Sequence, residues 1–333
     1  TDNDTTVLVT KTPRTRMDEQ LRSLSDGVIR LERGEEGRRA SVPKHRGVGQ
    51  RDGTHGLDIT QDGLAVYPAL RPDRSKRAFD PAPLSSGIDE LDAVLGGGLE
   101  RGTVTIVSGP SGVGKSTMAT YFLRTAAESG DGAHAYLFEE SIETFTHRAE
   151  TFDIPVTELR EGGALTVEEV VPQTRSPEEF AQLVTDRVTE RTPAVVVIDG
   201  IEGYQTAIKG SEDEVDLQRR LHTLTRHLTN LNVAVILIDE RHEVAGLHQP
   251  TGSDVSYLAD NLVFQHYIEL DGDLQRVVGV LKKRIAGFET TPRRFAITAD
   301  GFSVGEPMRD LQGLLDGIPE RSDGSEHGGS VQG

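Results

Sequence analysis

The sequence predicts an α/β fold in which helices flank a parallel sheet, followed by an antiparallel C-terminal extension of that sheet. Two observations support this prediction. Continuous apolar, β-branched runs alternate with helical segments over the middle of the chain, which is typical of parallel strands buried on both faces. After Tyr257 one strand-like segment follows another, which indicates antiparallel pairing.

The expected elements follow from local patterns. Buried strands are expected at residues 103–108, 133–138, 194–198 and 232–238, because each is a short apolar run. Helices are expected at residues 115–128, 176–191 and 213–230; the second opens with Ser-Pro-Glu-Glu, which combines an N-cap, a first-turn Pro and a capping-box Glu. The extension is expected at residues 262–270, 275–283 and 293–298.

Composition excludes several classes of protein. The 333 residues contain no Cys, which excludes disulfide scaffolds, thiol catalysts and Cys-ligated zinc sites. No apolar run approaches the ~18 residues of a membrane span, and the first residues do not resemble a signal peptide. These observations favour a cytoplasmic protein without a membrane partner.

The charge balance is strongly acidic. There are 36 Lys+Arg against 54 Asp+Glu, for a net charge of −18, and only 7 of the basic residues are Lys. An acidic, Lys-poor surface of this kind is typical of proteins from extreme halophiles, and it disfavours non-specific binding to nucleic acid. An ordinary acidic protein is the alternative interpretation.

The chain divides by composition into four parts. Residues 71–83 are polar and Pro-containing and are interpreted as a linker, residues 84–319 as the main domain, and residues 320–333 as a disordered acidic tail. Residues 1–70 are similar to the last third of the main domain, and chance similarity between two β-hairpins is the alternative interpretation. Lys44 and Arg46 precede Lys282 and Arg284 by 238 positions, and residues 24–26 precede residues 258–260 by 234. Residues 7–10 are aligned with the strand at 232–238.

A phosphate-binding loop is the strongest motif. Residues 109–116 (GPSGVGKS) fit G-x-x-x-x-G-K-[ST] between an expected strand and an expected helix. In such a loop backbone N–H groups surround phosphates, the Lys reaches the β and γ oxygens, and the hydroxyl ligates Mg²⁺. The residues assigned to ATP binding are Gly109, Pro110, Ser111, Gly112, Val113, Gly114, Lys115, Ser116 and Thr117.

Three carboxylates are candidates for the chemistry. Asp199 ends an apolar strand, where a second Mg²⁺ ligand is expected beside Ser116, although an Asp there also serves as a helix cap. Glu139 and Glu140 follow the strand at 133–138, so they face the crevice at the carboxyl edge of the sheet. There one of them can activate water; two solvated acids are the alternative. No His spacing supports a metal site other than Mg²⁺.

Together these motifs resemble the KaiC-like ATPases of the RecA superfamily. The similarity covers residues 84–92 (LSSGIDELD), residues 95–99 (LGGGL), the phosphate loop, Glu139-Glu140 and residues 280–284 (VLKKR). The resemblance implies a RecA-like core, a haloarchaeal type given the composition, catalytic roles for the paired Glu residues, and a preceding KaiC-like module whose end is residues 1–70.

The resemblance also implies assembly. In the family, the residues matching Lys282 and Arg284 approach the ATP of a neighbouring subunit, which implies a head-to-tail homo-oligomer, a hexameric ring. A solvated cationic stripe is the alternative. The family's late His has no counterpart in residues 285–288 (IAGF), and its phosphorylated Ser-Thr pair reads Ser256-Tyr257 here, so Ser256 is the remaining candidate phosphosite.

Three functions are compatible with these residues. The first is an oligomeric regulatory ATPase with an unidentified protein partner and a possible weak serine autokinase activity. The second is a DNA-binding recombinase paralogue of the RecA/RadA type, which requires a basic surface that residues 200–260 do not clearly supply. The third is a non-catalytic module that binds ATP to gate an interaction.

Overall fold

The computed structural model describes residues 6–11, 18–34, 37–47, 49, 51–71, 82–171, 175–207, 214–240, 256–270, 272–309, 311–312 and 320–321. The chain divides into two compact units, Thr1–Ala69 and Leu70–Gly333. We call these the N-terminal unit and the C-terminal unit.

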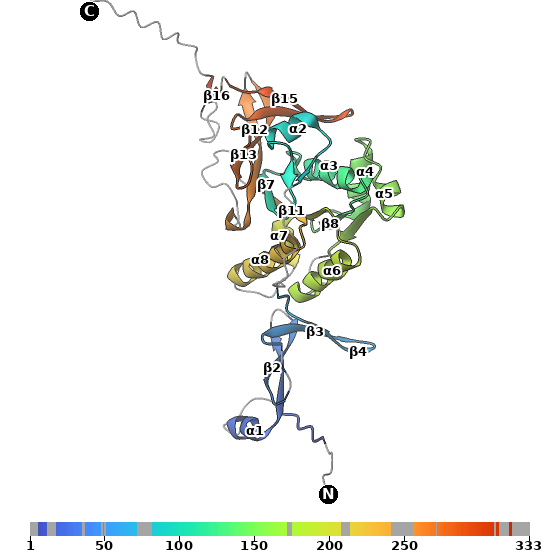
Figure 1. Ribbon diagram of the computed structural model, residues 1–333, viewed down its shortest axis with the longest axis vertical. Coiled ribbons are helices and arrows are strands. Elements are labelled where there is room, and N and C mark those ends of the chain that lie inside the picture. Colours follow the sequence, from blue (N-terminus) through green and yellow to red (C-terminus); the bar gives the residue numbers. More distant parts are fainter. Residues whose placement is uncertain are drawn as a thin grey trace, which may run out of the picture. The chain divides into compact units, whose positions relative to one another are not determined.

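In its described part, the C-terminal unit is built around a nine-stranded sheet (Figure 1). The strands, in sheet order, are β15 (Gly301–Pro307), β14 (Arg293–Thr298), β13 (Asp273–Lys283), β12 (Asn261–Leu270), β7 (Val104–Gly109), β11 (Ala234–Glu240), β10 (Val195–Asp199), β8 (Ala133–Leu137) and β9 (Leu165–Glu169). From β12 to β9 all neighbours pair in parallel, whereas β12 to β15 pair antiparallel. The α/β prediction with an antiparallel extension is therefore confirmed.

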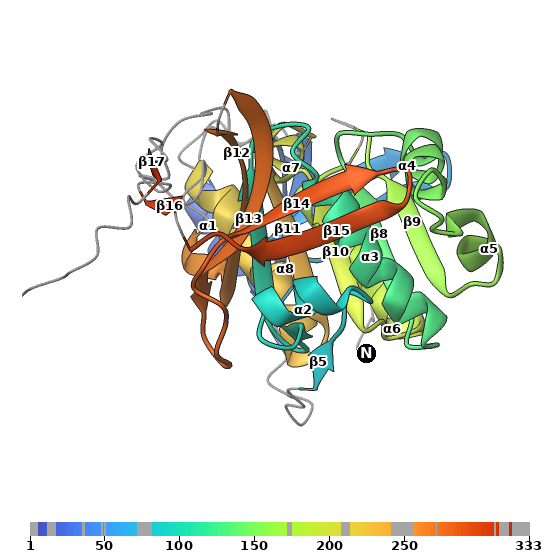
Figure 2. The ribbon, with the colours of Figure 1, turned by 90° about the horizontal axis from the view of Figure 1, so that it is seen from above.

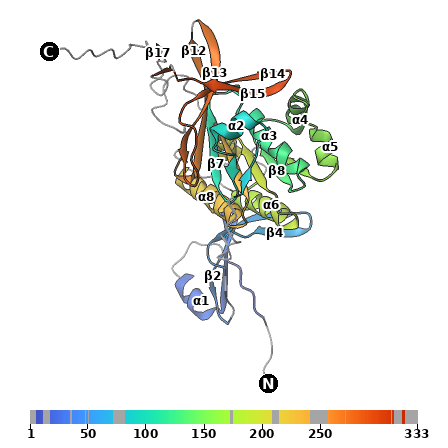
Figure 3. The same cartoon turned by 45° about the horizontal axis from the view of Figure 1, so that its top comes forward.

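Helices cover both faces of this sheet (Figures 1 and 3). One face packs on α2 (Asp89–Val94), α3 (Lys115–Glu128), α4 (Ile142–Glu150) and α5 (Val156–Glu161). The other face packs on α6 (Pro177–Glu190), α7 (Ile201–Ala207) and α8 (Glu214–Asn230). Every residue of β7, β8 and β10 is buried, as a strand between two helical layers requires.

The expected helices and strands form within two residues of their expected ends, a normal uncertainty in element bounds. The Ser176 hydroxyl accepts the Glu179 N–H at 3.1 Å, so α6 begins as the capping pattern predicts. Several elements of the C-terminal unit were not expected from the sequence, among them α2, α4, α5, α7 and β9. α4 also begins at a capping Ser, since the Ser141 hydroxyl accepts the Thr144 N–H at 3.2 Å.

The extension reaches back over the helical layer. Figure 2 shows β14 and β15 running alongside α2 and α3. The Tyr121 and Phe302 rings lie 6.1 Å apart, and the Tyr121 hydroxyl accepts the Phe302 N–H at 3.0 Å. This contact joins α3 to the last hairpin, so the helix that follows the phosphate loop is enclosed by strands from the far end of the chain.

The N-terminal unit is a short helix followed by a four-stranded antiparallel meander. Its elements are α1 (Asp18–Leu24), β1 (Gly27–Gly34), β2 (Gly37–His45), β3 (Thr54–Thr60) and β4 (Gly63–Tyr67). Among its described side chains, Ala40 and Leu57 are the buried apolar ones. Residues 7–10, which could match the strand at 232–238, form no strand. In the C-terminal unit β11 lies between two parallel strands, and the described N-terminal unit provides neither of them.

Smaller elements complete the described structure. β5 (Pro83–Leu84) pairs with β6 (Leu99–Glu100), η1 (Ser256–Leu258) is a 3₁₀ turn, and β16 (Leu311–Gln312) pairs with β17 (Glu320–Arg321). That last pair extends two residues into the segment expected to be disordered. Most of the expected linker, residues 72–81, lies outside the described residues. No helix in the described part is long and apolar enough to cross a membrane.

Candidate functional site

The phosphate loop connects the end of β7 to the start of α3, as the motif predicts. Gly112 and Gly114 have φ angles of +73° and +122°, which favour glycine. A Cβ on Gly109 would lie 2.1 Å from the Gln265 carbonyl oxygen, and one on Gly114 would lie 2.4 Å from Ile297 Cδ1. The loop is therefore pressed against β12 and β14, and only glycine fits these two positions.

Lys115 is buried and points into this loop. Its Nζ donates to the carbonyl oxygens of Gly109 at 2.8 Å and Pro110 at 2.9 Å. Burial lowers the pKa of Lys115, while the charges of Glu240, Asp199 and other acids oppose that shift. A buried ammonium held by neutral carbonyls and surrounded by acids is well placed to exchange those carbonyls for an anionic phosphate.

Asp199 ends β10 and lies buried beside the start of α3. Burial raises its pKa to about 6; a hydrogen bond from Ser116 opposes this shift, and the charge of Glu140 adds to it. A buried carboxylate and a hydroxyl are the hard oxygen ligands that Mg²⁺ takes. The pair therefore fits a magnesium ion, whose charge would favour the ionised form of Asp199.

The two adjacent glutamates have different surroundings. Burial raises the pKa of Glu139, the charge of Glu240 adds to this, and an N–H bond from Gly203 opposes it. Gly200 leaves room for the Glu139 side chain, since a Cβ there would lie 2.6 Å from Glu139 Oε1. The structure thus gives Glu139 the surroundings of a base that titrates closer to neutral pH than an exposed Glu.

Glu140 is instead held by a cation. Arg148 Nη2 lies 2.5 Å from Glu140 Oε1, and its Nη1 donates to Thr117 Oγ1 at 3.3 Å. Arg148 also lies over the Phe145 ring, 5.4 Å from its centre. Arg148 was not singled out from the sequence, because a single Arg in a helix carries no signal of this role. It links Glu140 on one side of the site to the first turn of α3 on the other.

The end of β11 adds two acids. Asp239 is fully buried, and Ser108 Oγ donates to it at 3.4 Å. Glu240 acts on the pKa of both Lys115 and Glu139, so it lies close to the site. β11 separates β7 from β10 in the sheet, and a buried strand ending in two acids is the sequence signal that identifies them.

Lys282 and Arg284 lie at the other end of the strands. Lys282 pairs in register with Leu262 near the start of β12, and Arg284 lines a pocket with Thr103 and Val104 at the start of β7. At about 3.3 Å per residue, β7 places roughly 17 Å between that end and the phosphate loop. The structure therefore does not bring Lys282 and Arg284 to the phosphate loop of their own chain.

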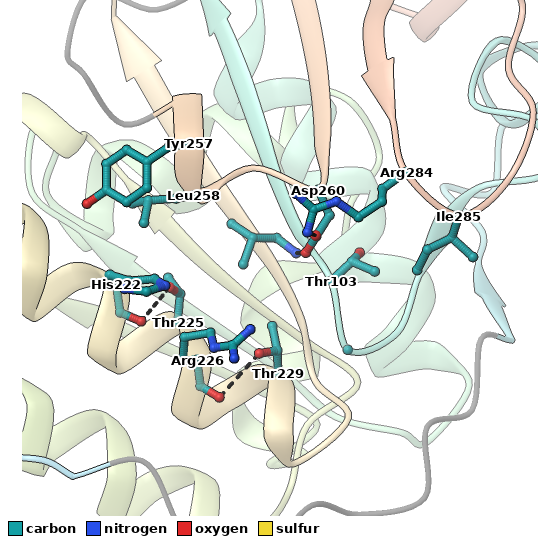
Figure 4. A pocket seen from close by; sticks show the side chains of 12 residues that line it. Thr103, His222, Thr225, Arg226, Thr229, Tyr257, Leu258, Asp260, Arg284 and Ile285 are labelled. Carbon is teal, nitrogen blue, oxygen red and sulfur yellow. Dashed lines mark hydrogen bonds and ion pairs between the residues drawn. The ribbon is translucent and has the colours of Figure 1, made fainter.

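Both cations are tied down where they lie. Lys282 Nζ donates to the Ala259 carbonyl at 2.6 Å, and Arg284 Nη1 lies 2.7 Å from Asp260 Oδ1. Figure 4 shows Arg284 and Asp260 beside a pocket of about 210 Å³ that Arg226 of α8 also lines. Ser256 begins η1 close by, followed by the half-exposed Tyr257.

Comparison with known proteins agrees with this geometry. A family model described as "ATPase: KaiC" matches residues 84–309. Among curated proteins, the circadian clock oscillator protein KaiC of Acaryochloris marina is 24% identical over 302 residues, and so is that of Nostoc. The circadian clock protein KaiC3 of Synechocystis is 25% identical over 295 residues. These matches cover 90%, 90% and 88% of this chain but 57% of each relative, so the chain spans little more than half their length. The match of the family model to most of the chain shows that it belongs to the KaiC ATPase family.

Proposed function

We propose that this chain binds Mg·ATP at the phosphate loop and hydrolyses it slowly as an oligomeric regulatory ATPase. The observation that carries the proposal is the convergence of four groups at the carboxyl edge of the sheet. Lys115, the Ser116–Asp199 pair and Glu139 come from three separate strand ends and act on each other's pKa values. Such a cluster supplies cation, metal ligands and base around one phosphate position.

The residues divide the work as follows. Lys115 leaves the carbonyls of Gly109 and Pro110 to pair with the β and γ oxygens of ATP. Ser116 and Asp199 would hold Mg²⁺, which would supply positive charge beside the phosphate oxygens. Glu139 takes a proton from the attacking water as the bond between the γ-phosphorus and the bridging oxygen breaks, which releases ADP and phosphate. Glu140, fixed by Arg148, positions Thr117 and the first turn of α3.

The test is Mg²⁺-dependent phosphate release in multimolar KCl. We expect Lys115→Ala and Glu139→Gln to lower the rate at least about 100-fold, with Glu139→Gln still binding ATP. Glu190→Gln is the matched control, because that carboxylate is 69% exposed at the end of α6. If wild type binds ATP but releases no phosphate, the chain is a nucleotide-gated binding module and the hydrolytic proposal is wrong.

We propose further that Lys282 and Arg284 complete the ATP site of a neighbouring subunit in a homo-oligomer, a hexameric ring by resemblance. Their position at the far end of β7 supports this, because a head-to-tail contact joins opposite ends of two subunits. The test mixes Lys115→Ala with Arg284→Ala, each of which should have at most about a tenth of the wild-type rate alone. Equal mixing should restore about a quarter of the wild-type rate, because a quarter of the interfaces then combine two intact halves. No recovery would overturn the trans role.

The remaining proposals concern setting and regulation. The acidic, Lys-poor composition supports a salt-adapted cytoplasmic protein. We also propose that a protein partner, not yet identified, binds this chain as a regulatory ATPase. Ser256 remains the candidate for weak autophosphorylation. Mass spectrometry after incubation with Mg·ATP tests it, and an unmodified Ser256 in protein that turns over ATP would exclude it.

A further inference from the structure

A buried ion pair anchors the end of β13, between the two cations proposed to act on a neighbouring subunit. Lys283 Nζ lies 2.8 Å from Glu100 Oε1, and the two side chains are 1% and 5% exposed. The same ammonium donates to the carbonyl oxygens of Leu95 and of Gly98, the latter at 2.9 Å. Three acceptors therefore surround a group with three N–H donors, which suits Lys and not the planar fork of Arg.

The carboxylate of this pair also holds the facing strand. Asn261 lies directly opposite Lys283 in the pairing of β12 with β13, and its Nδ2 donates to Glu100 Oε2 at 3.4 Å. The same Nδ2 lies 3.3 Å from the Thr103 hydroxyl and 3.1 Å from that of Thr105. One buried carboxylate thus joins the ends of β12 and β13 beside the start of β7.

The partners of the two outer cations belong to the same strand end. Lys282 Nζ donates to the Ala259 carbonyl, and Arg284 Nη1 pairs with Asp260, as Figure 4 shows for the second pair. Asn261 follows these two residues directly. The place of both outer cations therefore depends on a segment that the buried carboxylate holds.

This strand end needs an anchor because its register is irregular. The pairing of β12 with β13 shifts between Leu262 and Val263, as it does at a β-bulge. Residues 282–284 are three cations in a row, so a slip of one residue would turn a different cation inward. The ion pair with Glu100 fixes Lys283 as the inward one.

A buried ion pair is a costly way to hold a strand. Desolvation of the two charges offsets much of their attraction, and apolar residues of similar size often stabilise a fold as well or better. Hydrogen bonds between charged groups have fixed directions, however, which apolar contacts lack. The Glu100–Lys283 pair therefore contributes position more than stability.

We propose that Glu100, Lys283 and Asn261 are positioning residues that aim Lys282 and Arg284 at the ATP of a neighbouring subunit. This inference rests on the trans role proposed above for those two cations. The three buried residues touch neither ATP nor water themselves, and they act by fixing the register and direction of the strand end.

The test replaces the ion pair by an apolar pair. Because Glu100→Leu/Lys283→Met removes both buried charges, we expect it to keep a Tm close to that of wild type and to bind Mg·ATP. It should release phosphate at least about 10-fold more slowly, because the outer cations lose their alignment. Glu100→Gln, which keeps the size of the side chain, should show the same pattern with a smaller loss. Arg101→Met is the matched control, since Arg101 pairs with Asp131, whose side chain is 53% exposed, and it should leave the rate unchanged.

Mixing shows which half of the site is damaged. The double variant should behave as Arg284→Ala does, so an equal mixture with Lys115→Ala should recover about a quarter of the wild-type rate. A mixture with Arg284→Ala should recover nothing, because both chains then lack the same half. A merely structural role would damage the phosphate loop as well, and neither mixture would recover.

Lysine labelling tests the alignment without ATP hydrolysis. The chain has only 7 Lys, so pulsed acetylation read by mass spectrometry resolves each amine. We expect Lys282 to react at least about 5-fold faster in the double variant, because its amine is released from the Ala259 carbonyl. Lys44 in the N-terminal unit should react at the same rate in both proteins.

Three outcomes would overturn the proposal. These are wild-type phosphate release by the double variant, no recovery with Lys115→Ala in conditions where Arg284→Ala does recover, and an unchanged labelling rate of Lys282. If wild type releases no phosphate, or if Lys115→Ala and Arg284→Ala do not complement each other, the proposed function fails. The labelling rate of Lys282 still decides the positioning in that case.

Discussion

The two antiparallel meanders of this chain have the same register but differ in burial at several equivalent positions. β1–β4 and β12–β15 pair in the same order and with matching partners, yet Leu64 lies open where Phe302 is core. Strand pairing is set by alternation and turn residues within each meander, so both copies form it. Burial depends on what lies over the sheet, and the C-terminal unit has α2 and α3 there.

The largest expected effect tests that difference directly. Phe302→Ala removes a ring stacked 4.9 Å from Phe295 within the core, and we expect a loss of about 3–5 kcal/mol in the free energy of unfolding. Leu64→Ala at the matching exposed position should cost less than about 0.5 kcal/mol. Urea unfolding followed by far-UV circular dichroism measures both, and equal losses would show that the N-terminal face is covered in solution.

The sequence predicts those features of the fold that depend on neighbouring residues, and it misses those that depend on contacts between distant parts of the chain. The phosphate loop, Asp199 and the Ser-capped helix α6 were predicted, because each signal lies within a few residues. β9, α4 and α5 were not predicted, since short elements stabilised by packing carry weak patterns. Residues 7–10 could match a strand by sequence but form none, because a parallel strand needs flanking partners and the described N-terminal unit provides none.

In the candidate site, too, the residues were predicted from local motifs, but their contacts with residues elsewhere in the chain were not. The paired glutamates were predicted as equivalent candidates, and the structure separates them, because Arg148 holds Glu140 while Gly203 donates to Glu139. Arg148 comes from α4, an element that the sequence did not predict, so its contact with Glu140 could not be anticipated. The position of Lys282 and Arg284 far from their own phosphate loop likewise depends on the register between β12, β13 and β7.

A second prediction contrasts a buried carboxylate with an exposed one. Burial raises the pKa of Asp199 to about 6 from 3.8, so the folded protein binds this proton more tightly than the unfolded chain does. Stability therefore falls as pH rises from about 4 to about 6 and stays lower above that range. Without Mg²⁺, Asp199→Asn should stabilise the protein by up to about 3 kcal/mol at pH 7.5 and have little effect near pH 4.

Thermal unfolding across pH 4 to 8 measures this effect, with Asp58→Asn in the N-terminal unit as the surface control. The same Asp199→Asn variant should lose Mg²⁺-dependent ATP hydrolysis. Destabilisation at pH 7.5 without Mg²⁺ would show that the Ser116 hydrogen bond outweighs the cost of burying the charge.

The repeated ion pairs give a third comparison. Arg284–Asp260 and Arg46–Asp26 occupy equivalent positions, but only the first lies in a unit with its own phosphate loop. We expect Arg284→Ala to lower steady-state ATP hydrolysis at least about 10-fold, and Arg46→Ala to leave it unchanged. Equal losses would show that both meanders act on the same ATP site, and no loss for Arg284→Ala would remove it from the reaction.

The smallest expected effect concerns the glycines that turn the two last hairpins. Gly63 and Gly301 have φ angles of +119° and +103°, so Ala at either position should cost about 1 kcal/mol of backbone strain. At Gly301 a Cβ would also lie 2.4 Å from Tyr121 Oη, whereas nothing lies within 4 Å at Gly63. Gly301→Ala should therefore weaken its hairpin by about 1 kcal/mol more, because Tyr121 must give up the Phe302 N–H. Amide hydrogen exchange of each hairpin measures the two costs. Equal costs would mean that Tyr121 moves freely and that α3 does not fix the position of the last hairpin over the phosphate loop.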